Sequence, residues 1–194
     1  MQRVDTRILI LILCLMAVIL SAGCTNPDTG NQTISKSNSP QSTHITQSGN
    51  ESSWMTVPIT DTITGKQTTI EELAEEGKPV IIHSFAVWCP ACSIQLRETA
   101  KLLKENPGAY TVLGIDLDSR ENTEMIKSHI EKNQFVGMYI AAPTELTKGL
   151  IQTVGPKVVQ SLPQTLIICN KKITYVGDGA FPESKLKSIL SELC

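Results

Sequence analysis

An almost continuous apolar segment that leads into two cysteines constrains this chain more than any other feature. Residues Lys78–Ala86 read KPVIIHSFA, which predicts a buried strand, and Trp88–Cys92 read WCPAC at the start of a helical pattern. Two cysteines three positions apart at a helix start lie about one turn from each other, close enough to form a disulfide. The first, Cys89, would lie where free backbone N–H groups and the helix dipole favour a thiolate. Because a thiolate is the nucleophile of disulfide exchange, this placement predicts redox chemistry.

Hydrophobic periodicity and turn signals divide the rest of the folded region into alternating helices and strands. Thr69 and Glu72 form a predicted capping box over a short helix that Gly77 ends. We expect helices at 69–76, from the cysteine pair to Asn106, at 121–133, at 144–154 and from Pro182 onward, and strands at 78–86, 110–117, 136–142, 164–169 and 172–176. The last two strands, joined at Asn170-Lys171, predict a β-hairpin. This order predicts an α/β fold with a central mixed β-sheet flanked by helices.

Charge and cysteine content exclude several classes of protein. The net charge of −2 over 194 residues argues against a nucleic-acid partner, which would require a basic face. The six cysteines are too few and too unevenly spaced for a small disulfide-stapled fold, and no second CxxC completes a four-cysteine zinc site. The sequence therefore predicts no metal and no other cofactor.

Residues 1–24 have the layout of a membrane-targeting segment. Arg3 and Arg7 precede the apolar run Ile8–Leu20, and Ser21-Ala22-Gly23-Cys24 resembles a lipobox, although Ser21 stands where leucine is usual. Three outcomes stay open: lipidation at Cys24, an uncleaved signal anchor, or cleavage and secretion. Each places the remainder of the chain on the extracytoplasmic side, where disulfide chemistry is sustained.

The segment that follows is polar and without periodicity. Residues 25–53 are rich in Ser, Thr and Asn, and no apolar pattern in them could form a core. They predict a disordered tether between the cell membrane and a folded domain at residues 54–194.

With a buried strand, a WCxxC motif and a downstream proline ahead of a hairpin, the chain resembles the thioredoxin superfamily. It is similar to the membrane-tethered, extracytoplasmic TlpA/ResA-like thiol–disulfide oxidoreductases over about residues 54–194, and the helix–strand insertion at 121–142 also fits that branch. The matching segments are Lys78-Pro79-Val80, Ala86–Cys92, Gly114-Ile115-Asp116 and Ser161–Thr165. The resemblance implies a thioredoxin fold whose partners are protein thiols and disulfides.

Four residues form the core of the predicted site. We expect Cys89 to attack a substrate disulfide and Cys92 to resolve the mixed disulfide, with a structural disulfide or a soft-metal site as alternatives. Trp88 is predicted to shield the pair on one side, unless it is a core aromatic. The resemblance implies a cis Leu162–Pro163 peptide packed beside the pair, where substrate backbone can bind; the alternative is a trans proline that begins an edge strand.

His83 and Gln95 depart from the usual surroundings of such a pair. His83 lies six residues before Cys89, where thioredoxins carry a buried acid, and Gln95 lies where several relatives carry a glutamate. Gln95 cannot titrate. His83 is interpreted either as a proton acceptor or relay for Cys92 near neutral pH or as a hydrogen-bonded core histidine.

The remaining cysteines, histidines and acids receive simpler interpretations. Cys169 is predicted to be a buried thiol and Cys194 an exposed one, with a disulfide between them as the alternative. His129 is predicted to be a solvated surface residue, and Asp116-Leu117-Asp118 a turn at a strand end rather than a metal-binding pair.

These features predict an extracytoplasmic, membrane-tethered oxidoreductase that exchanges disulfides with other proteins. The predicted second partner is a membrane electron donor or acceptor. The resemblance favours reduction of target proteins, and that direction implies the donor. One rival is a thiol-based copper carrier, whose family spaces its cysteines by three residues rather than two. Peroxide reduction lacks support, because peroxiredoxins offer Thr-x-x-Cys and this chain has Ala86 three residues before Cys89.

Overall fold

The computed structural model describes residues 53–194 of the chain. Helices and strands alternate along most of this region. In chain order the elements are η1 (Ser53–Thr56), β1 (Ile59–Thr60), β2 (Gln67–Thr68), α2 (Ile70–Glu75), β3 (Val80–Phe85), α3 (Pro90–Glu105), β4 (Thr111–Asp116), α4 (Thr123–Asn133), β5 (Met138–Ala141), α5 (Thr144–Val154), α6 (Lys157–Gln160), β6 (Gln164–Cys169), β7 (Lys172–Asp178) and α7 (Glu183–Leu193).

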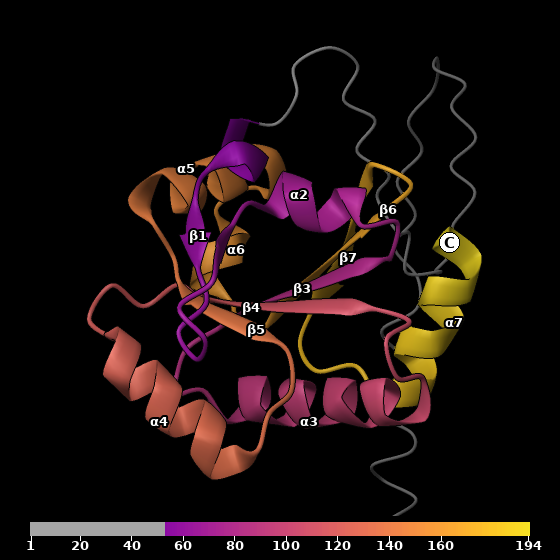
Figure 1. Cartoon of the computed structure of the whole chain (residues 1–194), viewed down its shortest axis with the longest axis horizontal. Coiled ribbons are helices and arrows are strands. Elements are labelled where there is room, and N and C mark those ends of the chain that lie inside the picture. The colour runs from indigo at the N-terminus through magenta and orange to yellow at the C-terminus, as the bar shows by residue number, and fades with distance from the viewer. Residues whose placement is uncertain (1–52) are drawn as a thin grey trace, which may run out of the picture. The chain divides into compact units, whose positions relative to one another are not determined.

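A five-stranded mixed sheet forms the centre of the domain (Figure 1). Its strand order is β5-β4-β3-β6-β7, with β3, β4 and β5 parallel and β6 antiparallel to both β3 and β7. The predicted mixed sheet is confirmed. The predicted insertion is also confirmed, because α4 and β5 follow β4 and place β5 at the sheet edge.

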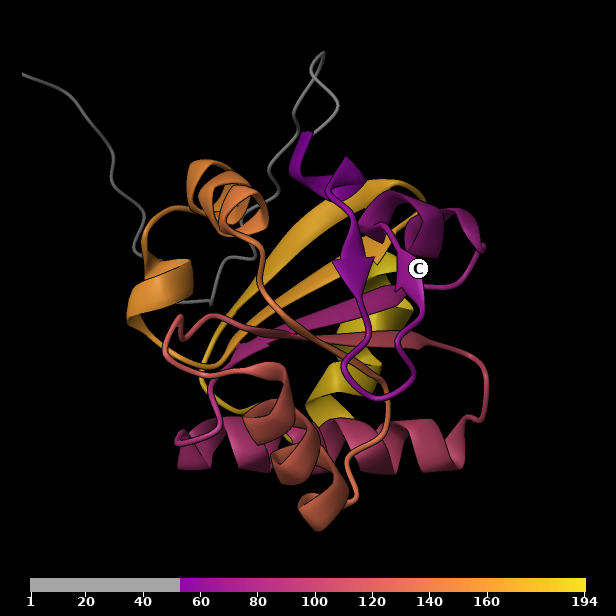
Figure 2. The same ribbon diagram turned by 60° about the vertical axis from the view of Figure 1, so that its left-hand side comes forward.

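Helices cover both faces of this sheet (Figure 2). On one face, η1, α2, α5 and α6 pack over a large apolar cluster that includes Trp54, Val80 and Ile82. On the other face, α3, α4 and α7 enclose two further clusters, one with Phe85, Cys89 and Cys92 and one with residues of α7. Successive side chains of a strand point to opposite faces, so β3, which is buried along its whole length, contributes to both layers.

Local sequence signals account for most element boundaries. The Thr69–Glu72 capping box is present at the start of α2, with both reciprocal hydrogen bonds formed. Asn170 and Lys171, which join β6 to β7, both have positive φ, as a two-residue type I′ hairpin turn requires. Four short elements were not predicted: η1, β1, β2 and α6. Each has at most four residues, too few to show a hydrophobic period.

A disulfide joins Cys169 at the end of β6 to Cys194, which follows α7. The prediction that these residues are unpaired thiols is therefore wrong. The reason is tertiary, since α7 packs against α3 and brings residue 194 next to the end of β6, with Cα atoms 5.8 Å apart.

The predicted targeting segment (1–24) and tether (25–53) lie outside the described residues, apart from Ser53, and stay predictions. Among residues 53–194, none of the helices combines the length and the apolar character needed to cross a membrane.

Gly149 lies in α5 where the helix meets η1. A Cβ atom at this position would lie 2.1 Å from Cβ of the buried Trp54. In an open helix Gly→Ala would stabilise by about 0.5–1 kcal/mol, but here the overlap reverses the sign, because Trp54 can yield only by moving its backbone. We expect Gly149→Ala to lower the free energy of unfolding by about 2 kcal/mol in urea titrations, and Lys148→Ala, on the exposed side of the helix, to change it little. A Gly149→Ala protein as stable as the parent would contradict this packing.

Candidate active site

The two cysteines of the WCxxC motif lie at the N-terminus of α3. Cys89 is the N-cap residue, and its Sγ accepts a hydrogen bond from the backbone N–H of Cys92 at 3.1 Å. Pro90 occupies the first helical position, where its missing N–H costs nothing. The two cysteines form a disulfide, with Cα atoms 5.3 Å apart. The backbone at this helix end is therefore placed to stabilise negative charge on Sγ of Cys89 when the disulfide opens.

Burial differs sharply across the motif. Cys89 and Cys92 are 5% and 1% exposed, whereas Trp88 is 61% exposed. The alternative interpretation of Trp88 as a core aromatic is therefore wrong. Its indole Nε1 donates to Oδ2 of Asp118 at 2.7 Å, which fixes the orientation of the ring at the surface.

Pro163 lies directly before β6, and the Leu162–Pro163 peptide is cis, as the resemblance implied. The carbonyl oxygen of Leu162 is 3.9 Å from Sγ of Cys89. The carbonyl of Pro163 accepts from the N–H of Gly179, and the N–H of Gln164 donates to Oγ of Ser84 in β3. These bonds hold the proline turn against β3, so that backbone lies beside the sulfur of Cys89.

His83 is fully buried in β3, between two threonine hydroxyls. Nε2 lies 2.9 Å from Oγ1 of Thr99, and Nδ1 lies 3.1 Å from Oγ1 of Thr165. Thr99 donates its only hydroxyl hydrogen to the carbonyl of Gln95, so it accepts from the Nε2–H of His83, and Nδ1 accepts from Thr165. Burial lowers the pKa of His83 from 6.5 to about 3, and the ring is therefore neutral near pH 7. These contacts favour the core-histidine interpretation; a role in proton transfer stays a prediction.

Gln95 connects α3 to the segment before α7. Its Oε1 accepts from the N–H of Phe181 at 2.6 Å, and its Nε2 donates to Oγ1 of Thr99 at 3.2 Å. The side chain is completely buried. Gln95 therefore links His83, through Thr99, to the connection between β7 and α7, and it has a structural task where several relatives carry a titrating acid.

The loop after β4 braces the residues that precede Cys89, a contact that the sequence did not reveal. Oε2 of Glu121 accepts from the N–H of Val87 at 2.7 Å, and Oδ1 of Asp116 accepts from the N–H of Asp118 at 2.8 Å. The predicted turn at Asp116–Asp118 is thus confirmed. Sequence spacing could not have identified Glu121, which lies 34 residues from its partner.

Two acids of this loop have displaced pKa values. Hydrogen bonds from Arg120 and Trp88 hold the pKa of Asp118 well below its usual range. Burial, followed by the neighbouring Glu121, raises the pKa of Asp116 from 3.8 to about 8. Asp116 is 3% exposed, and its Oδ2 has no hydrogen-bond partner within the described part of the chain. Burial therefore favours the neutral form of this carboxyl more than that of an ordinary aspartate.

His129 is not the solvated surface residue that was predicted. It is half-buried on α4, with Nε2 3.4 Å from Oγ of Ser93 and its ring 5.5 Å from that of Phe135. Burial lowers its pKa. The prediction failed because helical spacing alone does not show which side of α4 meets α3.

Within residues 53–194, no three His, Cys, Asp or Glu side chains are grouped so that they could hold a metal ion. The described geometry instead presents a disulfide at a helix start, an exposed tryptophan and a cis-proline turn. Sulfur exchange at Cys89 is the chemistry that this arrangement can carry out.

The fold and this site define the class of the protein, a thiol–disulfide oxidoreductase of thioredoxin fold. The model of the AhpC/TSA family matches residues 52–176, and the chain belongs to that family. No curated protein matches the sequence.

Several solved structures share this fold. A secreted disulfide oxidoreductase of Mycobacterium tuberculosis, homologous to E. coli DsbE, is 17% identical with a TM-score of 0.56, over 73% of this chain and 98% of that one. A thiol:disulfide interchange protein of Chlorobium tepidum is 19% identical with a TM-score of 0.57, over 72% and 95% of the two chains. StoA of Bacillus subtilis is 19% identical with a TM-score of 0.51, over 69% and 97%. The predicted thioredoxin fold is confirmed.

Proposed function

We propose that the protein reduces disulfides in other proteins on the extracytoplasmic side of the cell membrane, to which its N-terminal segment tethers it. The observation that carries the proposal is the position of Cys89, with the N–H of Cys92 on one side of its sulfur and the carbonyl of Leu162 on another. Backbone next to the reacting sulfur offers a substrate peptide a surface to pair with.

The reaction proceeds in two exchange steps. In the reduced protein the thiolate of Cys89 attacks one sulfur of a substrate disulfide, and the other substrate sulfur leaves as a thiolate and takes a proton. The thiolate of Cys92 then attacks Sγ of Cys89, which breaks the mixed disulfide and releases the second substrate thiol. The substrate has gained two electrons and two protons, and the Cys89–Cys92 disulfide has formed.

The structure supports Cys89 as the residue that attacks first. Cys89 caps the helix and keeps some exposure, whereas Cys92 lies within the first turn and is 1% exposed. A protein disulfide can therefore reach Cys89 while Cys92 stays covered. Trp88 precedes Cys89 in the chain and has an exposed ring, so we include it in the proposed contact surface.

The proposed direction of electron flow rests on the resemblance. The proposed extracytoplasmic location rests on the N-terminal segment. A reductant outside the cytoplasm must regain two electrons after each cycle, so we propose a membrane electron donor as its second partner. Arg3, Arg7 and the apolar run up to Leu20 support export, and Cys24 is the proposed lipidation site. The Mycobacterium tuberculosis structure that shares the fold is described as a secreted protein.

A redox titration tests the direction. The full-length chain, purified in detergent, is equilibrated in glutathione buffers, quenched in acid and alkylated, and each cysteine pair is quantified by peptide mass. We expect the midpoint of Cys89–Cys92 near the roughly −270 mV of thioredoxin rather than the roughly −120 mV of the oxidant DsbA.

A midpoint near that of DsbA would show that the protein oxidises its substrates instead of reducing them. The proposal of disulfide exchange at Cys89 would still stand. A reduced protein that binds Cu(I) tightly and reduces no protein disulfide would replace the proposal by the copper-carrier alternative.

A further inference from the structure

The two disulfides of the described domain lie at opposite ends of β6. The cis-proline turn that contacts Cys89 precedes the first residue of this strand, and Cys169 is its last residue. The strand rises about 3.3 Å per residue over six residues, which separates the Cys169–Cys194 disulfide from the active site by roughly 15–20 Å. The proposed exchange reaction makes no use of this second pair.

The second disulfide is open to solvent. Cys194 is exposed and Cys169 is half-buried, in contrast to the nearly covered pair at the active site. Exposure is a feature of labile disulfides, because a thiolate must reach a sulfur atom in order to attack it. Cys169–Cys194 meets this requirement of access.

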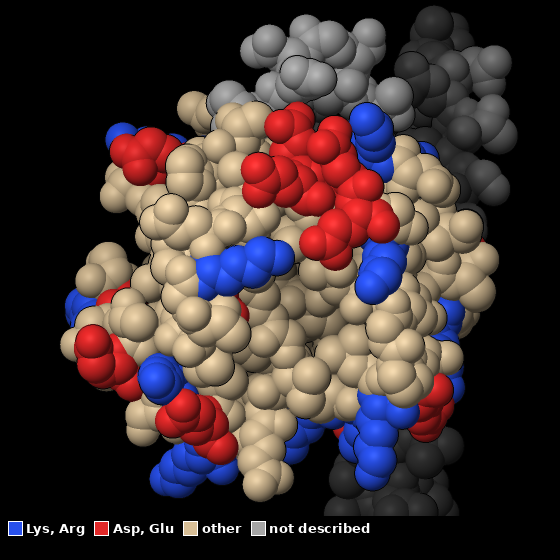
Figure 3. Space-filling model, in the orientation of Figure 1, with Lys and Arg blue, Asp and Glu red and all other residues tan. Residues whose placement is uncertain are grey.

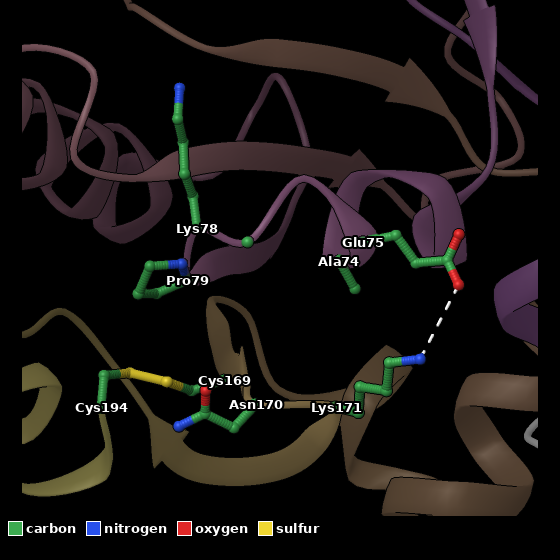
Figure 4. A pocket seen from close by; sticks show the side chains of 9 residues that line it. Ala74, Glu75, Lys78, Pro79, Cys169, Asn170, Lys171 and Cys194 are labelled. Carbon is green, nitrogen blue, oxygen red and sulfur yellow. Dashed lines mark ion pairs between the residues drawn. A yellow bond between two sulfur atoms is a disulfide. The ribbon is translucent and has the colours of Figure 1, made fainter.

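A surface pocket of about 640 Å³ adjoins this disulfide. The disulfide lies at one end of the pocket and the side chains of Lys171 and Glu75 at the other (Figure 4). A pocket of a few hundred Å³ has the size of a small-molecule site. Its lining residues are Ala74, Glu75, Gly77, Lys78, Pro79, Cys169, Asn170, Lys171 and Cys194.

Both signs of charge border the pocket. Lys171 pairs with Glu75 at 3.8 Å, but the two side chains are 81% and 59% exposed, so the pair is weak and can be exchanged for contacts to a ligand. Lys78 also lines the pocket, but its side chain points away from the disulfide in Figure 4. Figure 3 shows acidic side chains gathered over α2 next to Lys or Arg. The acids of this segment are Glu71, Glu72, Glu75 and Glu76, of which Glu75 lines the pocket. A small molecule with both a carboxylate and an ammonium group complements this surface.

We propose that Cys169–Cys194 is a second exchange site, which takes a zwitterionic low-molecular-weight thiol such as an amino-acid or small-peptide thiol. The thiolate of the small molecule attacks the exposed Sγ of Cys194, the Cys169–Cys194 bond breaks, and Cys169 leaves as a thiolate that takes a proton from water. The sulfur of the small thiol is oxidised and that of Cys169 is reduced, so no other reactant is required. The product carries the small thiol on Cys194.

The full-length chain with Cys89→Ser and Cys92→Ser isolates this site. The variant is incubated under native conditions with glutathione or, at equal thiolate concentration, with uncharged 2-mercaptoethanol. Reactions are quenched in acid, free thiols are blocked with a maleimide, and peptides are mapped by mass. We expect glutathione on Cys194 and maleimide on Cys169, at a rate at least tenfold above that of 2-mercaptoethanol. Lys171→Gln should reduce this preference, and Lys101→Gln, on the exposed side of α3, should leave it unchanged.

Three results would overturn the proposal. A disulfide that both thiols leave intact until urea is added is a structural link. Equal rates for the two thiols would show that the pocket does not select a zwitterion. Attachment of glutathione to Cys169 would contradict the assigned order of attack. None of these results bears on the active site, because the variant lacks both of its thiols.

Discussion

Cys92→Ser is expected to hold partner proteins on Cys89 as stable mixed disulfides, while Cys89→Ser traps nothing and lowers disulfide reduction at least about 10³-fold. In Cys92→Ser the first attack still occurs, because the N-cap position and the backbone N–H of residue 92 are kept. The second step fails, since a serine hydroxyl cannot displace the bound thiol. In Cys89→Ser no thiolate remains at the partly accessible position.

Trapped species are separated on non-reducing gels and identified by mass after reduction. Cys169→Ser with Cys194→Ser is the matched control, because it removes two cysteines and leaves the active site intact. That control should reduce protein disulfides like the parent. Mixed disulfides that form through Cys92 in the Cys89→Ser protein would show that the order of the two cysteines is the reverse.

Replacing His83 is expected to reduce the loss of unfolding free energy that occurs as the pH falls. Its pKa is about 3 in the folded protein and near 6.5 when unfolded, so the unfolded chain takes up the proton first as the pH falls. The stability from the neutral, buried ring is complete above about pH 6.5 and is lost progressively toward pH 3. Between pH 7.5 and pH 5 the loss amounts to roughly 2 kcal/mol.

Urea unfolding of the parent and of His83→Asn at several pH values measures this slope. The variant will be less stable at every pH because it leaves a smaller side chain in the core, but its stability should fall less between pH 7.5 and pH 5. Asp116, whose raised pKa favours the folded state at acid pH, acts with the opposite sign in both proteins and cancels in the difference. Parallel profiles would show that folding does not lower the pKa of His83.

The same variant addresses the alternative role of His83. If the ring relays the proton of Cys92, His83→Asn should slow resolution of the mixed disulfide at pH 7 and leave the first attack unchanged. A neutral ring bonded to Thr99 and Thr165 instead predicts equal, small effects on both steps. Stopped-flow measurement of the two steps distinguishes these outcomes.

Sequence reasoning was most accurate where the signal was local. The run from β3 into the WCxxC motif, the Thr69–Glu72 cap and the Asn170-Lys171 turn each depend on residues within a few positions of one another. It was least accurate for partners far apart in the chain. Spacing could not predict that Glu121 binds the N–H of Val87 or that His129 packs toward Ser93.

The sequence by itself determined the class of fold and the pair of cysteines that defines the site, because hydrophobic periodicity and a helix start are short-range properties. Only the tertiary structure decided the protonation state of the buried histidine near that site and the pairing of the two remaining cysteines of the domain. His83 is neutral because burial, with Thr99 and Thr165 from 16 and 82 residues away against its ring, disfavours the charged form. Cys169 and Cys194 pair because α7 folds back to the end of β6. Desolvation and proximity between distant segments arise only when the chain is packed, and no local pattern encodes them.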